Sequence, residues 1–211
     1  MKRIIVLCVF ALLITACNQE EQQVQYNSDN NSSEMPKAKK KHVKDDSLSV
    51  LDWSKELASN FQEQDFGGWT KAQFASTVLF SPYPTIDTTI HQQLSMSRMQ
   101  SLLEDTTQLI WGVEDGTGDT IKQSFAAYIE RYVVDFDVHD KRVTFQEKDT
   151  LTPIGNEIIN VKRFFPESTY VVIQKPADDD MGMNWRSLIF VFDDKEGESK
   201  LQAVIHNEWT I

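Results

Sequence analysis

The sequence has no cysteine after residue 17. Both of its cysteines, Cys8 and Cys17, lie near the N-terminus of the 211-residue chain. A folded part beyond them can form no disulfide, and exported domains without disulfides depend on a sizeable hydrophobic core. Roughly 160 residues follow the N-terminal region, which is enough chain for one such core.

Long hydrophobic runs and an excess of positive charge are also missing. The apolar run at residues 4–14 is 11 residues long, whereas a helix that spans a bilayer needs about 20 residues. The chain carries 32 acidic residues against 21 lysines and arginines, for a net charge of −11. The short run argues against a permanent transmembrane helix, and the acidic charge argues against a nucleic-acid partner, since phosphates attract basic surfaces.

Motifs typical of catalysis are absent as well. The sequence contains no G-x-S-x-G elbow, no S-x-x-K motif and no H-E-x-x-H motif. The domain histidines His91, His139 and His206 are far apart in sequence, so we expect no metal site and no cofactor. Acidic residues are too numerous for any pair, or for a set such as Asp135, Asp137 and His139, to indicate general acid–base chemistry.

The N-terminus has the three zones of a secretory signal. Met1, Lys2 and Arg3 are followed by the uncharged apolar run and then by the small residues Thr15 and Ala16 before Cys17. Ile14-Thr15-Ala16-Cys17 resembles the lipobox of bacterial lipoproteins. This resemblance implies that residues 1–16 are removed and that Cys17 carries lipid, such as diacylglycerol and palmitate. It therefore implies a membrane anchor, with the protein on the extracytoplasmic face of the cell membrane.

Residues 17–47 form the next zone, which we interpret as a disordered tether. This stretch contains almost no aliphatic residue and has one basic run at 37–44, so it buries too little apolar surface to offset the entropy of ordering. The basic run is compatible with attraction to anionic lipid or with a solvated linker. Residues 48–211 then form a single domain with 26 acidic and 14 basic residues.

The first half of this domain has helical patterns. Apolar residues recur on one helix face from Val50 to Phe61, with Ser49 as a candidate N-cap. A capping-box pattern at residues 70–73 indicates a second helix that continues to about Val78. Residues 95–105 favour a third helix, and Ser124 is a candidate N-cap for a fourth.

The remaining patterns indicate strands. Residues 108–113 and 120–123 flank an Asp- and Gly-rich turn and predict a hairpin. Five strands are predicted in the last third, at 142–146, 158–165, 170–174, 188–192 and 201–209. Their short connections favour an antiparallel meander. Strict alternation in the last strand predicts that Leu201, Ala203, Ile205 and Trp209 share one face.

This order of elements predicts an α+β fold in which N-terminal helices pack on a curved antiparallel sheet. The order resembles cystatin-like and NTF2-like folds, which implies a concave pocket. Stretches such as 80–83, 182–188 and 205–211 are similar to those of poorly characterised Firmicutes lipoproteins, a family that implies no particular activity.

Aromatic residues beside polar groups are the candidate ligand-binding residues. Trp111, Trp185 and Trp209 could line a pocket in which Arg186 and His206 contact a polar ligand, or they could fill a core. The sequence therefore favours a lipid-anchored binding or accessory protein of the bacterial cell envelope, with an unknown small molecule or envelope protein as partner. The sequence is also compatible with two alternatives, namely an envelope enzyme that uses dispersed carboxylates with His206, and a protein-interaction module.

Overall fold

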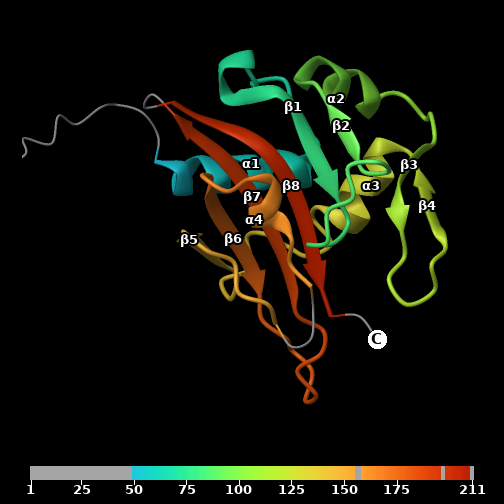
Figure 1. The fold of residues 1–211 in the computed structure, drawn as a ribbon, viewed down its shortest axis with the longest axis vertical. Helices are drawn as coiled ribbons and strands as arrows, with labels where there is room; N and C mark the ends of the chain where they lie inside the picture. Colours follow the sequence, from blue (N-terminus) through green and yellow to red (C-terminus); the bar gives the residue numbers. More distant parts are fainter. Residues whose placement is uncertain (1–48, 155–157, 196–197, 210–211) are drawn as a thin grey trace, which may run out of the picture. The chain divides into compact units, whose positions relative to one another are not determined.

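The computed structural model describes residues 49–154, 158–195 and 198–209. The predicted signal peptide, lipidation site and tether lie outside these residues. The described part is an α+β fold, as predicted, in which a twisted six-stranded sheet and a separate hairpin combine with four helices (Figure 1). The helices are α1 (Val50–Glu63), α2 (Met96–Leu103), α3 (Phe125–Tyr132) and the short α4 (Val161–Phe164).

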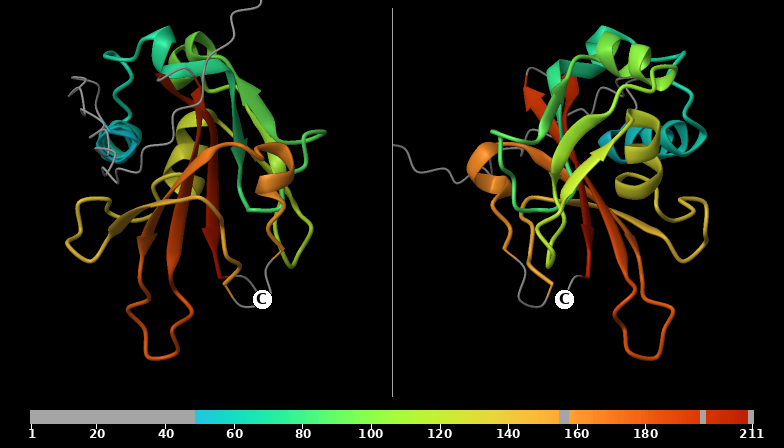
Figure 2. Two further views of the ribbon diagram at one scale, coloured as in Figure 1. Left: turned by 60° about the vertical axis from the view of Figure 1, so that its left-hand side comes forward. Right: turned by 90° about the vertical axis from the view of Figure 1, so that its right-hand side faces the viewer.

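The six-stranded sheet has the strand order β2-β1-β8-β7-β6-β5. Its strands are β1 (Phe74–Ser81), β2 (Gln92–Leu94), β5 (Thr144–Lys148), β6 (Thr169–Lys175), β7 (Arg186–Lys195) and β8 (Glu198–Glu208). All neighbours are antiparallel except β1 and β8, which are parallel. The predicted C-terminal meander is therefore present as β5 to β8, and Figure 2 shows how strongly this sheet twists.

Ser49 and Ser124 are the N-cap residues of α1 and α3, as the sequence predicted. The Ser49 hydroxyl accepts a hydrogen bond from the Asp52 amide at 3.1 Å, and the Ser124 hydroxyl accepts one from the Ala127 amide at 3.4 Å. Each bond satisfies an amide that has no partner within the first helical turn. The predicted hairpin is also confirmed, as β3 (Leu109–Val113) paired with β4 (Thr120–Gln123).

The predicted second helix is wrong. The capping box at Thr70 and Gln73 exists, but it closes only the single 3-10 turn η1 (Lys71–Gln73), and β1 starts at the next residue. Beyond the turn, Phe74 pairs with β8, and Val78 to Phe80 pair with β2. Pairing on both sides of β1 overrides the local helical signal, because tertiary context outweighs propensity.

The predicted strand at 158–165 is also wrong, since this segment contains α4. The Asn160 side chain accepts a hydrogen bond from the Ile86 amide at 2.7 Å and donates one to the Ile86 carbonyl at 2.9 Å. These two bonds attach the segment to the loop after β1 and replace a strand ladder. Sequence alternation alone gives no sign of such a partner, which lies 74 residues away.

The last strand departs from strict alternation at Gln202. Leu201 pairs with Phe192 and Ala203 pairs with Val191, so Gln202 is an extra residue on β8. Leu201 and Val204 therefore contribute to one hydrophobic cluster, whereas Ala203 and Ile205 contribute to the other. The prediction that Leu201 shares a face with Ala203 is wrong for this reason.

Both faces of the sheet are covered. The larger cluster, called here the aromatic core, contains Phe61, Phe80, Trp111, Phe125 and Tyr128 and lies against α1, α2 and α3. A smaller cluster on strands β1, β6, β7 and β8 also includes Val161 of α4 and Ile86. Because the helices and their aromatic side chains fill one side of the sheet, the packing there is that of a closed domain interior.

Candidate functional site

Polar residues are buried at the C-terminal end of β8. His206 is fully buried, and Asn207 and Glu208 are nearly so. Buried groups of this kind require partners. The partners come from two other elements, namely the start of β7, where Arg186 lies opposite Glu208, and the end of α3 with the residues that follow it.

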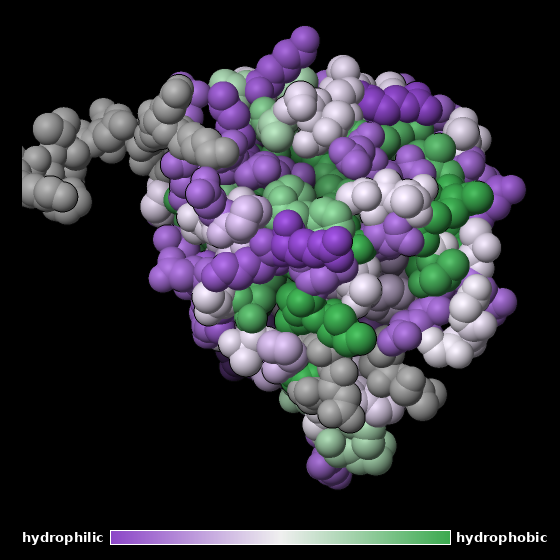
Figure 3. All heavy atoms as spheres, in the orientation of Figure 1, coloured by the Kyte–Doolittle hydropathy of each residue, from purple (hydrophilic) through white to green (hydrophobic). Residues whose placement is uncertain are grey.

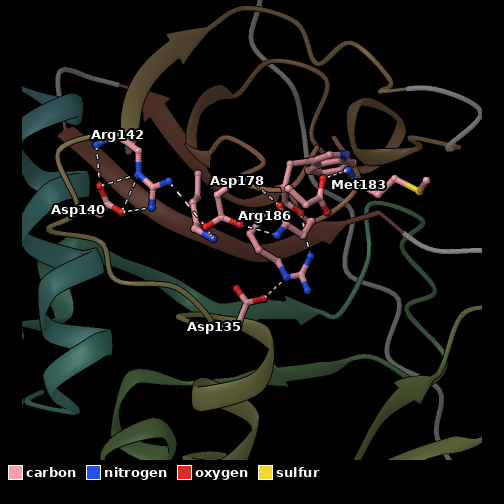
Figure 4. Close-up of polar contacts among 10 residues, drawn as sticks. Asp135, Asp140, Arg142, Asp178, Met183 and Arg186 are labelled. Atoms are coloured by element: carbon pink, nitrogen blue, oxygen red, sulfur yellow. Dashed lines mark hydrogen bonds and ion pairs between the residues drawn. The ribbon is translucent and has the colours of Figure 1, made fainter. Parts of the chain in front are cut away.

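Five side chains form what we call the charged cluster: Arg131, Asp135, Arg186, His206 and Glu208. The Arg186 Nε atom lies 2.7 Å from Asp135 Oδ2 and 3.3 Å from Glu208 Oε2. An Arg131 guanidinium nitrogen lies 2.7 Å from Glu208 Oε1. Figure 4 shows Asp135, after α3, directed towards Arg186 on β7. Each buried carboxylate is thus matched by a guanidinium group that is itself partly exposed.

The imidazole of His206 has an unequal environment at its two nitrogens. Its Nδ1 atom lies 3.2 Å from the carbonyl oxygen of Pro82, which can only accept a hydrogen bond, so Nδ1 carries the hydrogen. The Nε2 atom lies 3.3 Å from Asp135 Oδ2 but makes no hydrogen bond to any of the described residues. Asp135 Oδ1 is also buried, and within the described part of the chain it has no hydrogen-bond partner.

A second group of polar side chains adjoins the charged cluster. The hydroxyls of Tyr83 and Tyr132 donate to the two oxygens of Glu114, at 2.9 and 2.5 Å. Burial, together with the neighbouring Glu114 carboxylate, raises the pKa of both phenols well above the ordinary value. The Tyr132 ring also makes an edge contact with His206, and the charge of Glu208 contributes to the raised pKa of Tyr83. The tyrosines therefore connect the hairpin turn to the charged cluster.

The predicted ligand-binding residues are only partly brought together. Arg186 and His206 meet around Asp135. Trp111 instead lies in the aromatic core, stacked on Tyr128 with ring centroids 4.0 Å apart.

The other two tryptophans differ from each other. Trp185 is 8% exposed, and Trp209 lies beyond the end of β8 and is 43% exposed. Among the described residues, the three tryptophans therefore do not line a common pocket.

Sequence reasoning missed the partners that complete the cluster. Asp135 was one acid among many, and Glu208 was predicted to share a strand face with His206 but was not identified as part of a site. That spacing of two, which places both side chains on one face, was the available signal. Nothing local indicated Arg131 or Asp135, because both reach β8 through folding of α3 against the sheet.

The charged cluster also contains three atoms of the types that bind metal ions. Ligand atoms from Asp135, His206 and Glu208 all lie within 4.8 Å of one another. The sequence predicted no metal site because its histidines are isolated along the chain. In the folded domain, however, the carboxylates of Asp135 and Glu208 lie beside His206.

A cavity of about 310 Å³ lies elsewhere, on the side of the sheet where α4 packs. Its lining includes Ser76 and Thr77 of β1, Phe164 and Phe165 near α4, and Gln202. None of the predicted ligand-binding residues lines it. This cavity and the charged cluster are thus separate features.

The loop between β6 and β7 carries a further set of ion pairs (Figure 4). Asp178 lies 3.1 Å from the Lys175 ammonium and 3.7 Å from the Arg142 guanidinium. Hydrogen bonds from Lys175 and Asn184 lower the pKa of Asp178, and the hydrogen bonds of Arg142 lower the pKa of Asp140 to about 2. These acids are neutralised by nearby groups of the same chain.

The surface has no single dominant apolar face in the view of Figure 3, where hydrophobic atoms form several groups with hydrophilic atoms between them. Exposed apolar residues include Ile110 and Val113 of β3, Ile158, and Met181. Among the described residues, no helix is long and apolar enough to cross a bilayer.

Comparisons with known proteins give no relative for this chain. No protein-family model matches it, and no curated protein or solved structure is significantly similar to it.

Proposed function

We propose that this protein is a lipid-anchored binding or accessory protein on the extracytoplasmic face of a bacterial cell membrane. The observation that carries this proposal is the sequence Ile14-Thr15-Ala16-Cys17 at the end of a short apolar run with a basic start. The run is too short to span the bilayer, so attachment requires lipid on Cys17. Two or more acyl chains provide stable anchoring, whereas one does not.

The folded domain supports a non-catalytic role within this proposal. His206, the best candidate for a general base, is fully buried, and the cavity on the other side of the sheet does not include it. A general base must come within hydrogen-bonding distance of its substrate. An envelope enzyme that uses His206 is therefore the weaker alternative. We further propose a cystatin-like or NTF2-like architecture, supported by helices that cover one face of a twisted sheet.

The chain offers a matched pair of variants for testing the anchor. Cys17→Ala should release the full-length protein from membranes, or leave the uncut precursor, and should abolish labelling by a palmitate analogue. Cys8→Ala removes the other cysteine, which lies in the predicted signal peptide, and should leave processing and labelling unchanged. The measurement is fractionation of cells combined with the mass of the mature N-terminus.

Two results would count against the anchor. Labelling that survives in Cys17→Ala would show that lipid is attached elsewhere. A mature protein whose N-terminus is not residue 17 would show that the apolar run acts as an ordinary signal or as a membrane segment.

A further inference from the structure

We propose that Asp135, His206 and Glu208 form a binding site for one divalent transition-metal ion, which displaces the guanidinium group of Arg186. This inference concerns the folded domain and does not depend on lipid at Cys17. It rests on the geometry of the ligand atoms, on the orientation of His206, and on the position of Arg186.

The orientation of His206 is the first observation. The Pro82 carbonyl accepts the hydrogen of Nδ1, so Nε2 is the nitrogen that faces Asp135 and is available to a metal ion. Histidines that bind metals are held in this manner, with one nitrogen donating to a carbonyl or carboxylate and the other facing the ion. Nε2 is buried and makes no hydrogen bond within residues 49–154, 158–195 and 198–209, although Asp135 Oδ2 is only 3.3 Å away. A cation between the two atoms provides the partner that Nε2 lacks and replaces Arg186 at Asp135 Oδ2.

The spacing of the ligand atoms is the second observation. Tetrahedral sites with bonds of about 2.1 Å place their ligand atoms about 3.4 Å apart. The separation of 3.3 Å between His206 Nε2 and Asp135 Oδ2 is close to this value, and the Glu208 oxygen lies within 4.8 Å of both. Asp135 Oδ1, which is buried and without a hydrogen bond, provides a further donor after a small rotation. A modest adjustment of two carboxylates therefore completes a three-ligand set.

The position of Arg186 is the third observation. Its Nε atom already lies against both carboxylates and supplies the positive charge that they require. The Arg186 side chain is 28% exposed, so it has a route to solvent when an ion replaces it. Arg131 binds the other Glu208 oxygen and can remain in place. Arg186 thus competes with the ion, and removing it should strengthen metal binding.

The ligand types select the class of ion. One imidazole and two carboxylates, without thiolate, suit Zn²⁺ and Mn²⁺ among the divalent ions. Ca²⁺ and Mg²⁺ prefer sites made of oxygen ligands only. We expect Zn²⁺ and Mn²⁺ to bind with one ion per chain, and Ca²⁺ and Mg²⁺ to bind much more weakly.

The test is calorimetric titration of the full-length protein, in detergent and at neutral pH, with Zn²⁺ and Mn²⁺. His206→Gln should weaken Zn²⁺ binding by about tenfold or more. His139→Gln and His42→Gln are matched controls that should bind as the wild type does, since His139 is an exposed residue and His42 lies in the predicted tether. Arg186→Gln should bind Zn²⁺ more tightly than the wild type. Asp135→Asn takes the place of His206→Gln if circular dichroism shows that the latter is unfolded.

A second readout separates a metal site from a structural role of the cluster. Co²⁺ bound by the wild type should give the visible absorption bands of a low-coordinate site, and these bands should be lost in His206→Gln. Failure of both the wild type and Arg186→Gln to bind one Zn²⁺ or Mn²⁺ ion would overturn the proposal. Equal affinities in His206→Gln and wild type would also overturn it, and so would an unchanged or weaker affinity in Arg186→Gln.

Discussion

Strand β8 contributes to two regions that are stabilised in different ways. Leu201 and Val204 belong to the aromatic core, where rings pack against rings, for example Trp111 on Tyr128. Only a few residues later, His206 and Glu208 belong to the charged cluster, where each carboxylate has a guanidinium partner. The first region lowers the free energy of folding through burial of apolar surface.

The charged cluster is expected to contribute less to the free energy of unfolding than the aromatic core does. Charges that leave water carry a large desolvation cost, and their attraction often does no more than offset it. The aromatic core is therefore expected to contribute more to the stability of the domain than the charged cluster does. Three predictions test this division, in order of decreasing effect.

The largest effect is expected in the aromatic core. Trp111→Ala leaves a cavity beneath Phe80, Phe125 and Tyr128, and it should lower the free energy of unfolding by about 3–5 kcal/mol. Urea denaturation of the full-length protein measures this loss. The control is Trp209→Ala, which removes a largely exposed ring beyond β8 and should change the free energy by less than about 0.5 kcal/mol. Similar losses in the two variants would contradict the assignment of Trp111 to the core.

An intermediate effect is expected in the charged cluster. Arg186→Met leaves Asp135 and Glu208 with Arg131 as the remaining guanidinium, and it should lower the free energy of unfolding by about 1–3 kcal/mol. Asp135→Leu should cost a comparable amount. The double variant should lose less than the sum of the two single losses, because it leaves neither partner of the 2.7 Å ion pair behind.

A double-mutant cycle from urea denaturation measures this coupling. Additive losses would mean that the coupling free energy between Arg186 and Asp135 is close to zero. The ion pair would then contribute no more to stability than an exposed surface pair such as those around Asp178.

The accuracy of the sequence predictions differs between the two regions. The helix starts at Ser49 and Ser124, the hairpin, and the C-terminal meander were predicted because their signals are local. The capping box at Thr70 was interpreted as the start of a helix, and this was wrong because only one 3-10 turn forms before β1 pairs with β8 and β2. Local sequence patterns thus predict where a helix or strand begins better than they predict which other elements it pairs with.

The charged cluster was predictable only in part. Arg186 and His206 were identified as polar groups among aromatic residues, and they do converge. Asp135 lies 71 positions before His206, and no pattern relates the two. Trp111 was placed in a pocket as one of two options, and its burial in the core follows from the stacking of α3 on the hairpin. Burial and contacts between residues far apart in sequence determine which side chains meet at the site. The spacing of residues along the sequence reveals neither.

The smallest effect concerns His91, a buried histidine outside the charged cluster to which His206 belongs. The His91 Nδ1 atom accepts a hydrogen bond from the Asp87 amide at 3.2 Å and lies 3.0 Å from the Ser81 hydroxyl. Burial lowers the pKa of His91, and the Asp87 charge only partly opposes this shift. The unfolded chain therefore binds the proton more readily, so stability should fall as the pH drops below the unfolded-state value of about 6.5.

The measurement compares the urea midpoints of wild type and His91→Asn at about pH 7 and about pH 5. Asn retains an acceptor for the Asp87 amide but does not titrate in this range, so the decline between the two pH values should be smaller in the variant. Subtracting the two declines removes the contribution of the carboxylates and of the charged cluster, which both proteins share. An equal decline would mean that His91 accepts its proton as easily in the folded domain as in the unfolded chain. Burial of His91 outside the charged cluster would then carry no cost for its protonation.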